Sequence, residues 1–139
     1  MKSLLGKLGV ILIGLAIFGC AGMRGEDWKL YYSHKEYLGY YDTQNITRPS
    51  KNVVRLWTRW DFTEKGVLAV VGELGKKYEN LSWSVMSWEI DCAKKKYRQL
   101  SSTRYDHKGS VISSRGTPSE WRLIIQESVI SILYEEVCK

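Results

Sequence analysis

Alternation of apolar and polar side chains predicts β-strands over most of the chain beyond residue 27. The clearest case is the segment 53–62, VVRLWTRWDF, in which every second side chain belongs to the same face of an extended chain. One face is apolar, whereas the other carries arginines and a tryptophan, so this segment is predicted as a half-buried strand with a basic and aromatic outer face. The two faces consist of Val54, Leu56, Thr58, Trp60 and Phe62, and of Val53, Arg55, Trp57, Arg59 and Asp61.

The segment 82–92 alternates in the same way and places Cys92 on the face of Met86, Trp88 and Ile90, so its sulfur is expected to point inward. A basic turn then leads to a returning strand, and the sequence DHKG predicts a hairpin with Gly109 in the left-handed conformation. Residues 44–52 are predicted to be a connection without regular structure. The other predicted strands are 28–33, 36–42, 96–106, 110–113 and 121–124.

Two segments have helical character. Residues 127–139 form the clearest helix, because Ile130, Leu133, Tyr134 and Val137 recur at the spacing of one helix face. The segment 63–82 is ambiguous, since its apolar run suits a strand whereas its charged residues suit the solvated face of a short helix. A short helix is favoured there.

The N-terminus has the pattern of an export signal. Lys2 and Lys7 precede an apolar run at residues 8–18, about 16 Å of helix, which is too short for a hydrocarbon core of about 30 Å. The residues around Cys20 resemble the bacterial lipobox, in which the cysteine receives a diacylglyceryl group and becomes the first residue after cleavage. We expect a signal peptide at 1–19, lipid on Cys20 and a tether at 20–27. A plain secretory signal and an uncleaved anchor are the alternatives.

The three cysteines of the chain are then explained together. If Cys20 carries lipid, Cys92 and Cys138 remain, and an oxidising compartment allows them to pair. Closing that loop removes about 4 kcal/mol of chain entropy from the unfolded state. We therefore predict an α+β domain in which an antiparallel sheet carries a C-terminal helix, clasped to one face by the Cys92–Cys138 disulfide.

Charge narrows the choice of partner only slightly. The net charge of +6 for 139 residues falls to about +4 without Lys2 and Lys7. Such a mild excess could favour anionic lipid headgroups or an acidic partner, but it does not indicate nucleic-acid binding by an exported protein. A soluble charged surface is the simpler interpretation.

Three phrases together resemble the surface-adhesin protein E family over nearly all of the chain after the signal. They are YYDTQNITRPSKNVVRLWTRW, WEIDCAKKKYRQLSSTRYDHKG and WRLIIQESVISILYEEVCK, which contain the pairs Tyr41–Asp42, Asp91–Cys92 and Val137–Cys138. The resemblance implies an antiparallel sheet with a disulfide-tied C-terminal helix. It also implies an outer-membrane lipoprotein that binds host extracellular proteins, and it leaves a homodimer open. The chain departs from the family at Gln126, where proline is frequent.

Residue patterns for catalysis or metal binding are not evident in the sequence. His34 and His107 are isolated and are expected at the surface, and the motifs C-x-x-C and H-E-x-x-H do not occur. We therefore expect a binding protein rather than an enzyme, with no catalytic residue, metal or cofactor. The alternative is an envelope enzyme or small-ligand carrier that uses a cleft between helix and sheet.

Arg55, Trp57 and Arg59 are the candidate partner-binding residues, because aromatic side chains and arginines are the usual anchors of binding surfaces. A second interpretation is that the helix covers this face and that acidic residues pair with the arginines. A deep polar pocket with a histidine beside a carboxylate would favour the enzyme or carrier. A shallow face with exposed tryptophan and arginine would favour binding.

Overall fold

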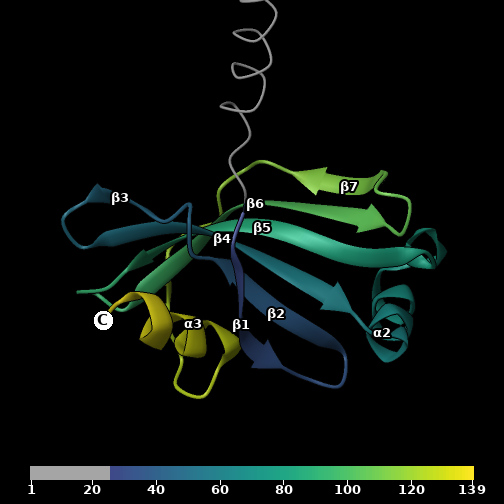
Figure 1. Ribbon diagram of the computed structural model, residues 1–139, viewed down its shortest axis with the longest axis horizontal. Coiled ribbons are helices and arrows are strands. Elements are labelled where there is room, and N and C mark those ends of the chain that lie inside the picture. Colours follow the sequence, from purple (N-terminus) through teal and green to yellow (C-terminus); the bar gives the residue numbers. More distant parts are fainter. Residues whose placement is uncertain (1–25) are drawn as a thin grey trace, which may run out of the picture.

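Three long antiparallel strands form the centre of the structure, a computed structural model that describes residues 26–139 (Figure 1). They are β4 (Val53–Phe62), β5 (Leu81–Asp91) and β6 (Lys96–Asp106). Shorter strands complete an eight-stranded antiparallel sheet in the order β1-β2-β4-β5-β6-β7, with β3 also along β4 and β8 also along β6. The shorter strands are β1 (Trp28–Ser33), β2 (Tyr37–Asp42), β3 (Thr47–Ser50), β7 (Val111–Arg115) and β8 (Arg122–Leu123).

The strand register confirms the two predicted faces of residues 53–62. Leu56 lies opposite Trp88 of β5, and its neighbour Arg55 lies opposite Glu89, so apolar and charged pairs alternate across the sheet. The pairing of β5 with β6 shifts between Ser87 and Trp88, where β6 contains one extra residue. Such a bulge bends and twists the strand that carries it.

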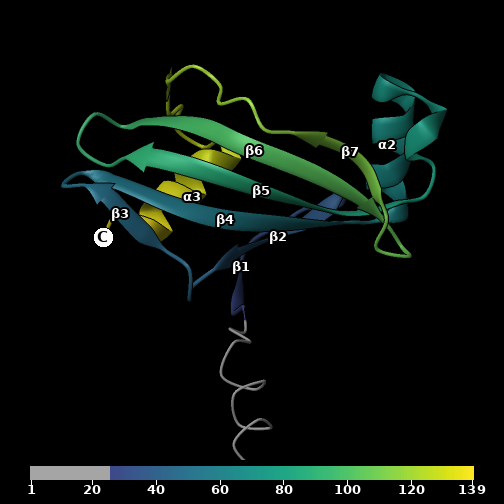
Figure 2. The same ribbon diagram turned by 90° about the horizontal axis from the view of Figure 1, so that it is seen from above.

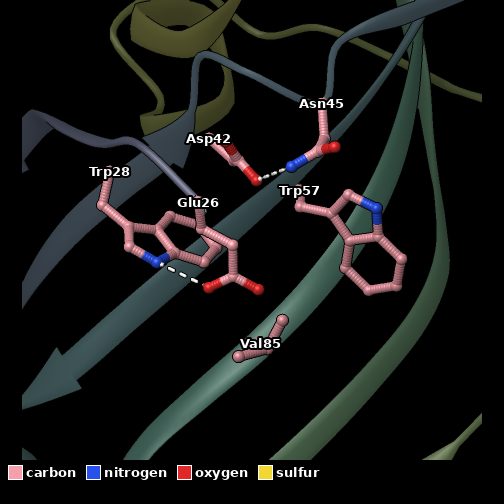
Figure 3. Close-up of a pocket in the computed structure, with 6 residues that line it drawn as sticks. All are labelled: Glu26, Trp28, Asp42, Asn45, Trp57 and Val85. Carbon is pink, nitrogen blue, oxygen red and sulfur yellow. Dashed lines mark hydrogen bonds between the residues drawn. The ribbon is translucent and has the colours of Figure 1, made fainter. Parts of the chain in front are cut away.

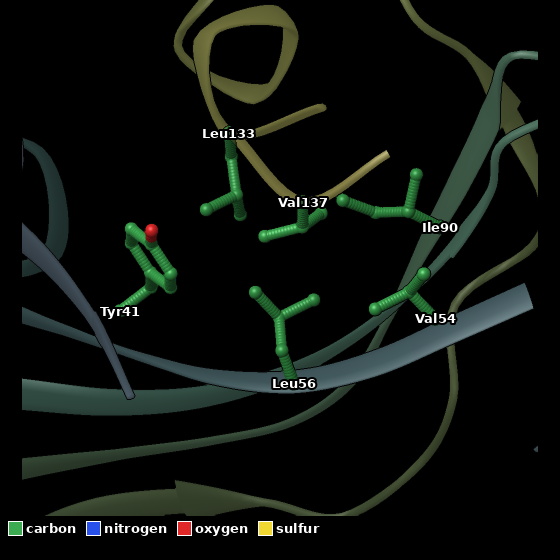
Figure 4. Close-up of a cluster of buried hydrophobic side chains, with 6 residues drawn as sticks. All are labelled: Tyr41, Val54, Leu56, Ile90, Leu133 and Val137. Atoms are coloured by element: carbon green, nitrogen blue, oxygen red, sulfur yellow. The ribbon is translucent and has the colours of Figure 1, made fainter. Parts of the chain in front are cut away.

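The C-terminal helix α3 (Val129–Val137) covers one face of the sheet and forms the core with it (Figure 4). Leu133 and Val137 of the helix are buried, as the predicted stripe requires, and Ile130 and Tyr134 pack against the same cluster. The Ser128 hydroxyl caps the helix by accepting a hydrogen bond from the Ser131 N–H at 3.3 Å. The buried residues of the cluster are Tyr41, Val54, Leu56, Ile90, Leu133 and Val137.

A disulfide joins the end of this helix to the sheet. Cys92 and Cys138 are bonded, with their Cα atoms 5.5 Å apart, and both pack against the core cluster. The Tyr134 hydroxyl adds a hydrogen bond to the carbonyl of Cys92 at 3.2 Å. The predicted fold class and the predicted clasp are therefore both confirmed.

The second helix, α2 (Glu64–Leu74), confirms the choice made for the ambiguous segment 63–82. It begins where the Thr63 hydroxyl accepts a hydrogen bond from the Gly66 N–H at 3.2 Å. A short 3₁₀ turn, η1 (Lys76–Tyr78), follows it. No helix within residues 26–139 is long and apolar enough to cross a membrane.

Both helices lie on the same side of the sheet. Figure 2 views the other side, with α3 behind the central strands and α2 beyond one end of the sheet. We call this other side the outer face, and within residues 26–139 no helix covers it. The interpretation in which the helix covers Arg55, Trp57 and Arg59 is therefore wrong, because the apolar stripe of α3 packs on the opposite side chains of β4.

One segment predicted as a connection contains a strand. Within residues 44–52, β3 pairs with β4 through Thr47 opposite Arg55 and Ser50 opposite Val53. All four residues of β3 are exposed, so no alternation of apolar and polar residues marks the strand. Pro49 is compatible with this position because β3 is an edge strand, where a missing N–H is tolerated.

Two glycines of α2 make a matched pair for a stability test. A Cβ at Gly66 would collide with the backbone carbonyl oxygen of Glu36, whereas one at Gly72 would have open space around it. Gly66→Ala is therefore expected to lower the free energy of unfolding by about 1–3 kcal/mol, through a forced shift of the helix. Gly72→Ala should raise it by about 0.5–1 kcal/mol, because alanine favours helix. Urea unfolding of both variants measures the difference, and equal effects would contradict the close approach.

Candidate binding face

The outer face brings together the three residues that the sequence singled out. Arg55, Trp57 and Arg59 project from β4 on the side away from α3. Trp57 keeps 40% of its surface exposed, and Trp121, which follows β7 and precedes β8, keeps 38%. Large apolar side chains thus remain partly in water on a sheet face that neither α2 nor α3 covers.

The centre of the outer face is a cluster of two arginines around one carboxylate. Glu89 is only 3% exposed, and its two oxygens are held by different arginines. Nη2 of Arg55 lies 2.8 Å from Oε2, and Nη2 of Arg98 lies 2.7 Å from Oε1. Burial alone would raise the pKa of Glu89, but the hydrogen bonds and charges of both arginines outweigh it and lower the pKa. The cluster as a whole therefore carries one uncompensated positive charge.

Arginine side chains on this face also stack on aromatic rings. The guanidinium of Arg98 lies 4.8 Å from the ring centre of Trp121, and that of Arg59 lies 4.9 Å from the ring centre of Trp83. Arg59 also pairs with Asp61, with Nε 2.7 Å from Oδ1. These contacts fix the arginine side chains in place, which lowers the entropy lost when a partner binds.

Sequence reasoning did not single out Glu89, Arg98 or Trp121. Glu89 has the parity of the outer face, but it becomes a partner of Arg55 only once the register of β4 against β5 is known. Arg98 joins it through the register of β6 beside the bulge. The acid pairing anticipated for the arginines is present, in the form of Glu89 and Asp61.

A hollow of about 380 Å³ opens beside the cluster on the outer face (Figure 3). Figure 3 shows the indoles of Trp28 and Trp57 on opposite sides of the hollow, with Val85 of β5 between them. The Glu26 carboxylate accepts a hydrogen bond from the Trp28 indole N–H at 3.0 Å. The lining residues are Glu26, Trp28, Asp42, Asn45, Trp57 and Val85.

Asp42 fixes the back of the hollow. Its carboxylate accepts hydrogen bonds from the backbone N–H groups of Asp27 at 3.2 Å and Gln44 at 2.9 Å, and from the Asn45 amide at 2.6 Å. Burial by itself would raise the pKa of Asp42, but these hydrogen bonds together lower it. The group therefore remains ionised at neutral pH while it orders the chain around β1 and β2.

The histidines lie away from this hollow. His34 stacks on Tyr32 with ring centres 5.9 Å apart, and its Nδ1 accepts a hydrogen bond from the Glu36 N–H at 3.3 Å. The segment 26–139 contains no group of three or more histidine, cysteine or acidic side chains arranged to hold a metal ion. Cys20, the predicted lipidation site, lies outside the residues that the structure describes.

A sequence profile of the family described as Surface-adhesin protein E matches residues 28–139, which is most of the chain. The chain belongs to the surface-adhesin protein E family. Comparisons with curated proteins and with solved structures gave no match. Membership of this adhesin family indicates a binding role toward an external protein or surface, and a location at the bacterial cell surface.

Acidification is expected to destabilise this surface-adhesin protein E domain. Asp42 and Glu89 both have a folded-state pKa below the ordinary carboxyl values of 3.8 and 4.5, so their stabilising contribution is complete above those values. It is lost as the pH falls through the lowered folded pKa values. Urea unfolding between pH 7 and pH 2.5 should therefore give a falling midpoint below about pH 4.5.

The matched control for this prediction is the pair of substitutions Asp42→Asn and Glu89→Gln. Each should lower stability at pH 7 and flatten its decline in acid, because the substituted side chain no longer takes up a proton. An unchanged slope in both variants would contradict the assignment.

Proposed function

We propose that this protein is a lipid-anchored adhesin of the bacterial outer membrane, and that its outer face binds a protein partner. The observation that carries the proposal is the uncovered sheet face with Trp57, Trp121 and the half-exposed Arg55. Tryptophan and arginine dominate the energetics of protein interfaces. Membership of the adhesin family supports the same role.

The arginine cluster supports binding because its geometry is ordered before a partner arrives. Glu89 holds Arg55 through two hydrogen bonds, at 3.1 and 2.8 Å, yet 49% of the Arg55 side chain remains exposed. An acidic group of a partner could therefore approach Arg55 without displacing Glu89. A pre-ordered side chain loses less conformational entropy on binding than a mobile one.

A capture experiment tests whether the protein binds a protein partner. It uses the chain from residue 20 onward with the substitution Cys20→Ser, which keeps the protein in solution. Extracellular-matrix proteins and envelope extracts are passed over the immobilised protein, and bound proteins are identified. Trp57→Ala should weaken retention of a captured partner at least about 10-fold, the range of an interface hot spot. The matched control is Leu68→Ala, since Leu68 is 71% exposed but lies on α2. Equal loss in both variants, or in neither, would contradict binding through the outer face.

Anchoring through Cys20 gives a separate prediction. Cys20→Ser is expected to release the protein from the membrane fraction, because it removes the acyl chains that provide stable anchoring. Metabolic labelling with an alkyne fatty acid should mark the original protein and leave the variant unmarked. Equal labelling of both forms would exclude lipidation at Cys20.

A carrier function is the second candidate, because a hollow of about 310 Å³ lies between α2 and the sheet. Trp60, Phe62 and Leu74 give it apolar walls, and Arg104 adds a positive charge. Glu73 lines the same hollow and supplies the opposite charge, so a small, largely apolar molecule with a polar end would suit the site. Native mass spectrometry of protein purified from cells tests this candidate, which predicts a co-purifying small molecule that Arg104→Gln releases.

A further inference from the structure

The hollow beside Trp57 has a different chemistry from the arginine cluster next to it. Two indole rings, Trp28 from β1 and Trp57 from β4, form opposite walls (Figure 3). The faces of indole rings carry negative charge density and attract cations. Trp57 is 40% exposed, so its ring is accessible from solvent.

The charged groups that line the hollow, within the described part of the chain, are all negative. Among residues 26–139, those that line it include two carboxylates, Glu26 and Asp42, and no lysine or arginine. Asp42 is nearly buried and already accepts three hydrogen bonds, so it contributes mainly through its field. Glu26 is exposed and forms no ion pair with any other residue of the segment 26–139. Its Oε2 accepts the Trp28 indole N–H, and within residues 26–139 its Oε1 has no hydrogen-bond partner, so that oxygen can accept a hydrogen bond from a ligand.

We propose that this hollow binds the cationic end of a lysine or arginine side chain presented by the protein partner. The cation would lie between the indoles of Trp28 and Trp57, and Glu26 would accept its hydrogen bonds. A volume of about 380 Å³ admits a long flexible side chain, and an opening on the outer face lets it enter from a partner's surface. The protein nature of the ligand rests on the proposed function, whereas the preference for a cation rests on the hollow alone.

Charge complementarity extends beyond the hollow and favours a protein surface as its occupant. Arg55 lies two residues from Trp57 on the same face of β4, and half of its side chain is exposed. The outer face thus presents a negative aromatic hollow beside a positive guanidinium. A protein segment with a basic residue close to an acidic one would match both sites, and such mixed charge is common on protein surfaces.

The test uses short peptides as probes and the chain from residue 20 onward with Cys20→Ser. Indole N–H signals are followed by NMR while an acetylated Gly-Lys-Gly amide, or its arginine counterpart, is added. The signals of Trp28 and Trp57 are assigned from Trp28→Phe and Trp57→Phe. We expect both cationic peptides to shift these two signals selectively, and the matched peptide with an acetylated lysine side chain to leave them in place.

Glu26→Gln separates the charge of the hollow from its shape. It should weaken binding of the lysine peptide about 5- to 10-fold, which corresponds to the loss of one partly exposed ionic contact. Glu120→Gln is the matched control, because Glu120 is also exposed but does not line the hollow. Binding that is unchanged in Glu26→Gln would overturn the assigned role of its carboxylate.

The remaining outcomes distinguish this inference from the proposed function. If neither the cationic peptides nor phosphatidylethanolamine vesicles shift the signals of Trp28 and Trp57, the cation site is overturned even if a partner is captured. If phosphatidylethanolamine vesicles shift them and the peptides do not, the protein ligand is overturned in favour of a lipid headgroup. If the peptides bind but no protein is captured, the cation site is supported and the proposed adhesin function is contradicted.

Discussion

Replacing Cys92 or Cys138 with serine is expected to lower the melting temperature by about 15 °C. The disulfide closes a loop over a sequence separation of 46 residues, and loss of this constraint costs about 4 kcal/mol in unfolded-state entropy. For a domain of this size, each kcal/mol corresponds to about 4 °C in Tm. The bond also holds the end of α3, with its buried Val137, against the core residue Ile90 of the sheet. Differential scanning calorimetry of the variants measures the shift.

The double variant provides the control for this prediction. Either single substitution already removes the whole bond, so Cys92→Ser with Cys138→Ser should melt close to the single variants. Under denaturing, non-reducing conditions, the chain with Cys20→Ser should show no titratable thiol. Additive losses in the double variant would mean that the two sulfurs contribute by packing rather than through their bond.

Removing both arginines from Glu89 is expected to cost more than the sum of the two single substitutions. Arg55→Met or Arg98→Met leaves one arginine on the carboxylate and should cost about 1 kcal/mol. The double variant leaves Glu89, which is 3% exposed, without an ionic partner, and should cost about 3–5 kcal/mol. Urea unfolding at pH 7 measures the coupling between the two sites.

A third substitution tests whether the buried charge of Glu89 causes the loss of stability in the double variant. Adding Glu89→Met to the double variant removes the uncompensated carboxylate and should restore most of the lost stability, because apolar side chains can replace a buried ionic cluster. If the triple variant is as unstable as the double variant, the loss comes from packing and not from the unpaired charge.

The sequence was sufficient to predict the helices and strands whose side chains face two different environments. β4 alternates because one side packs on α3 and the other faces water, so its faces could be assigned residue by residue. The stripe on α3 was visible for the same reason. β3 was missed because all of its residues are exposed, and a strand without a buried side has no periodic pattern.

The binding face could be predicted only in part. Arg55, Trp57 and Arg59 share one strand, so their common side follows from alternation alone. The hollow joins Trp57 of β4 to Trp28 of the edge strand β1 and to Glu26, which precedes that strand; β2 lies between β1 and β4. Its composition depends on the register of two strand pairs, and local sequence does not contain that information.

The hydrogen bonds around Asp42 would bear mechanical load if the chain is tethered at its N-terminus. Tension between a membrane and a partner on the outer face would enter the domain at Glu26 and pass through β1 and β2 to β4. The first bonds on that path are those of Asp27, whose N–H meets Asp42 at 3.2 Å and whose carbonyl accepts the Thr43 N–H at 2.8 Å. These bonds would therefore bear the pull before the disulfide does, since Cys92 and Cys138 join the end of β5 to the end of α3 farther along the chain.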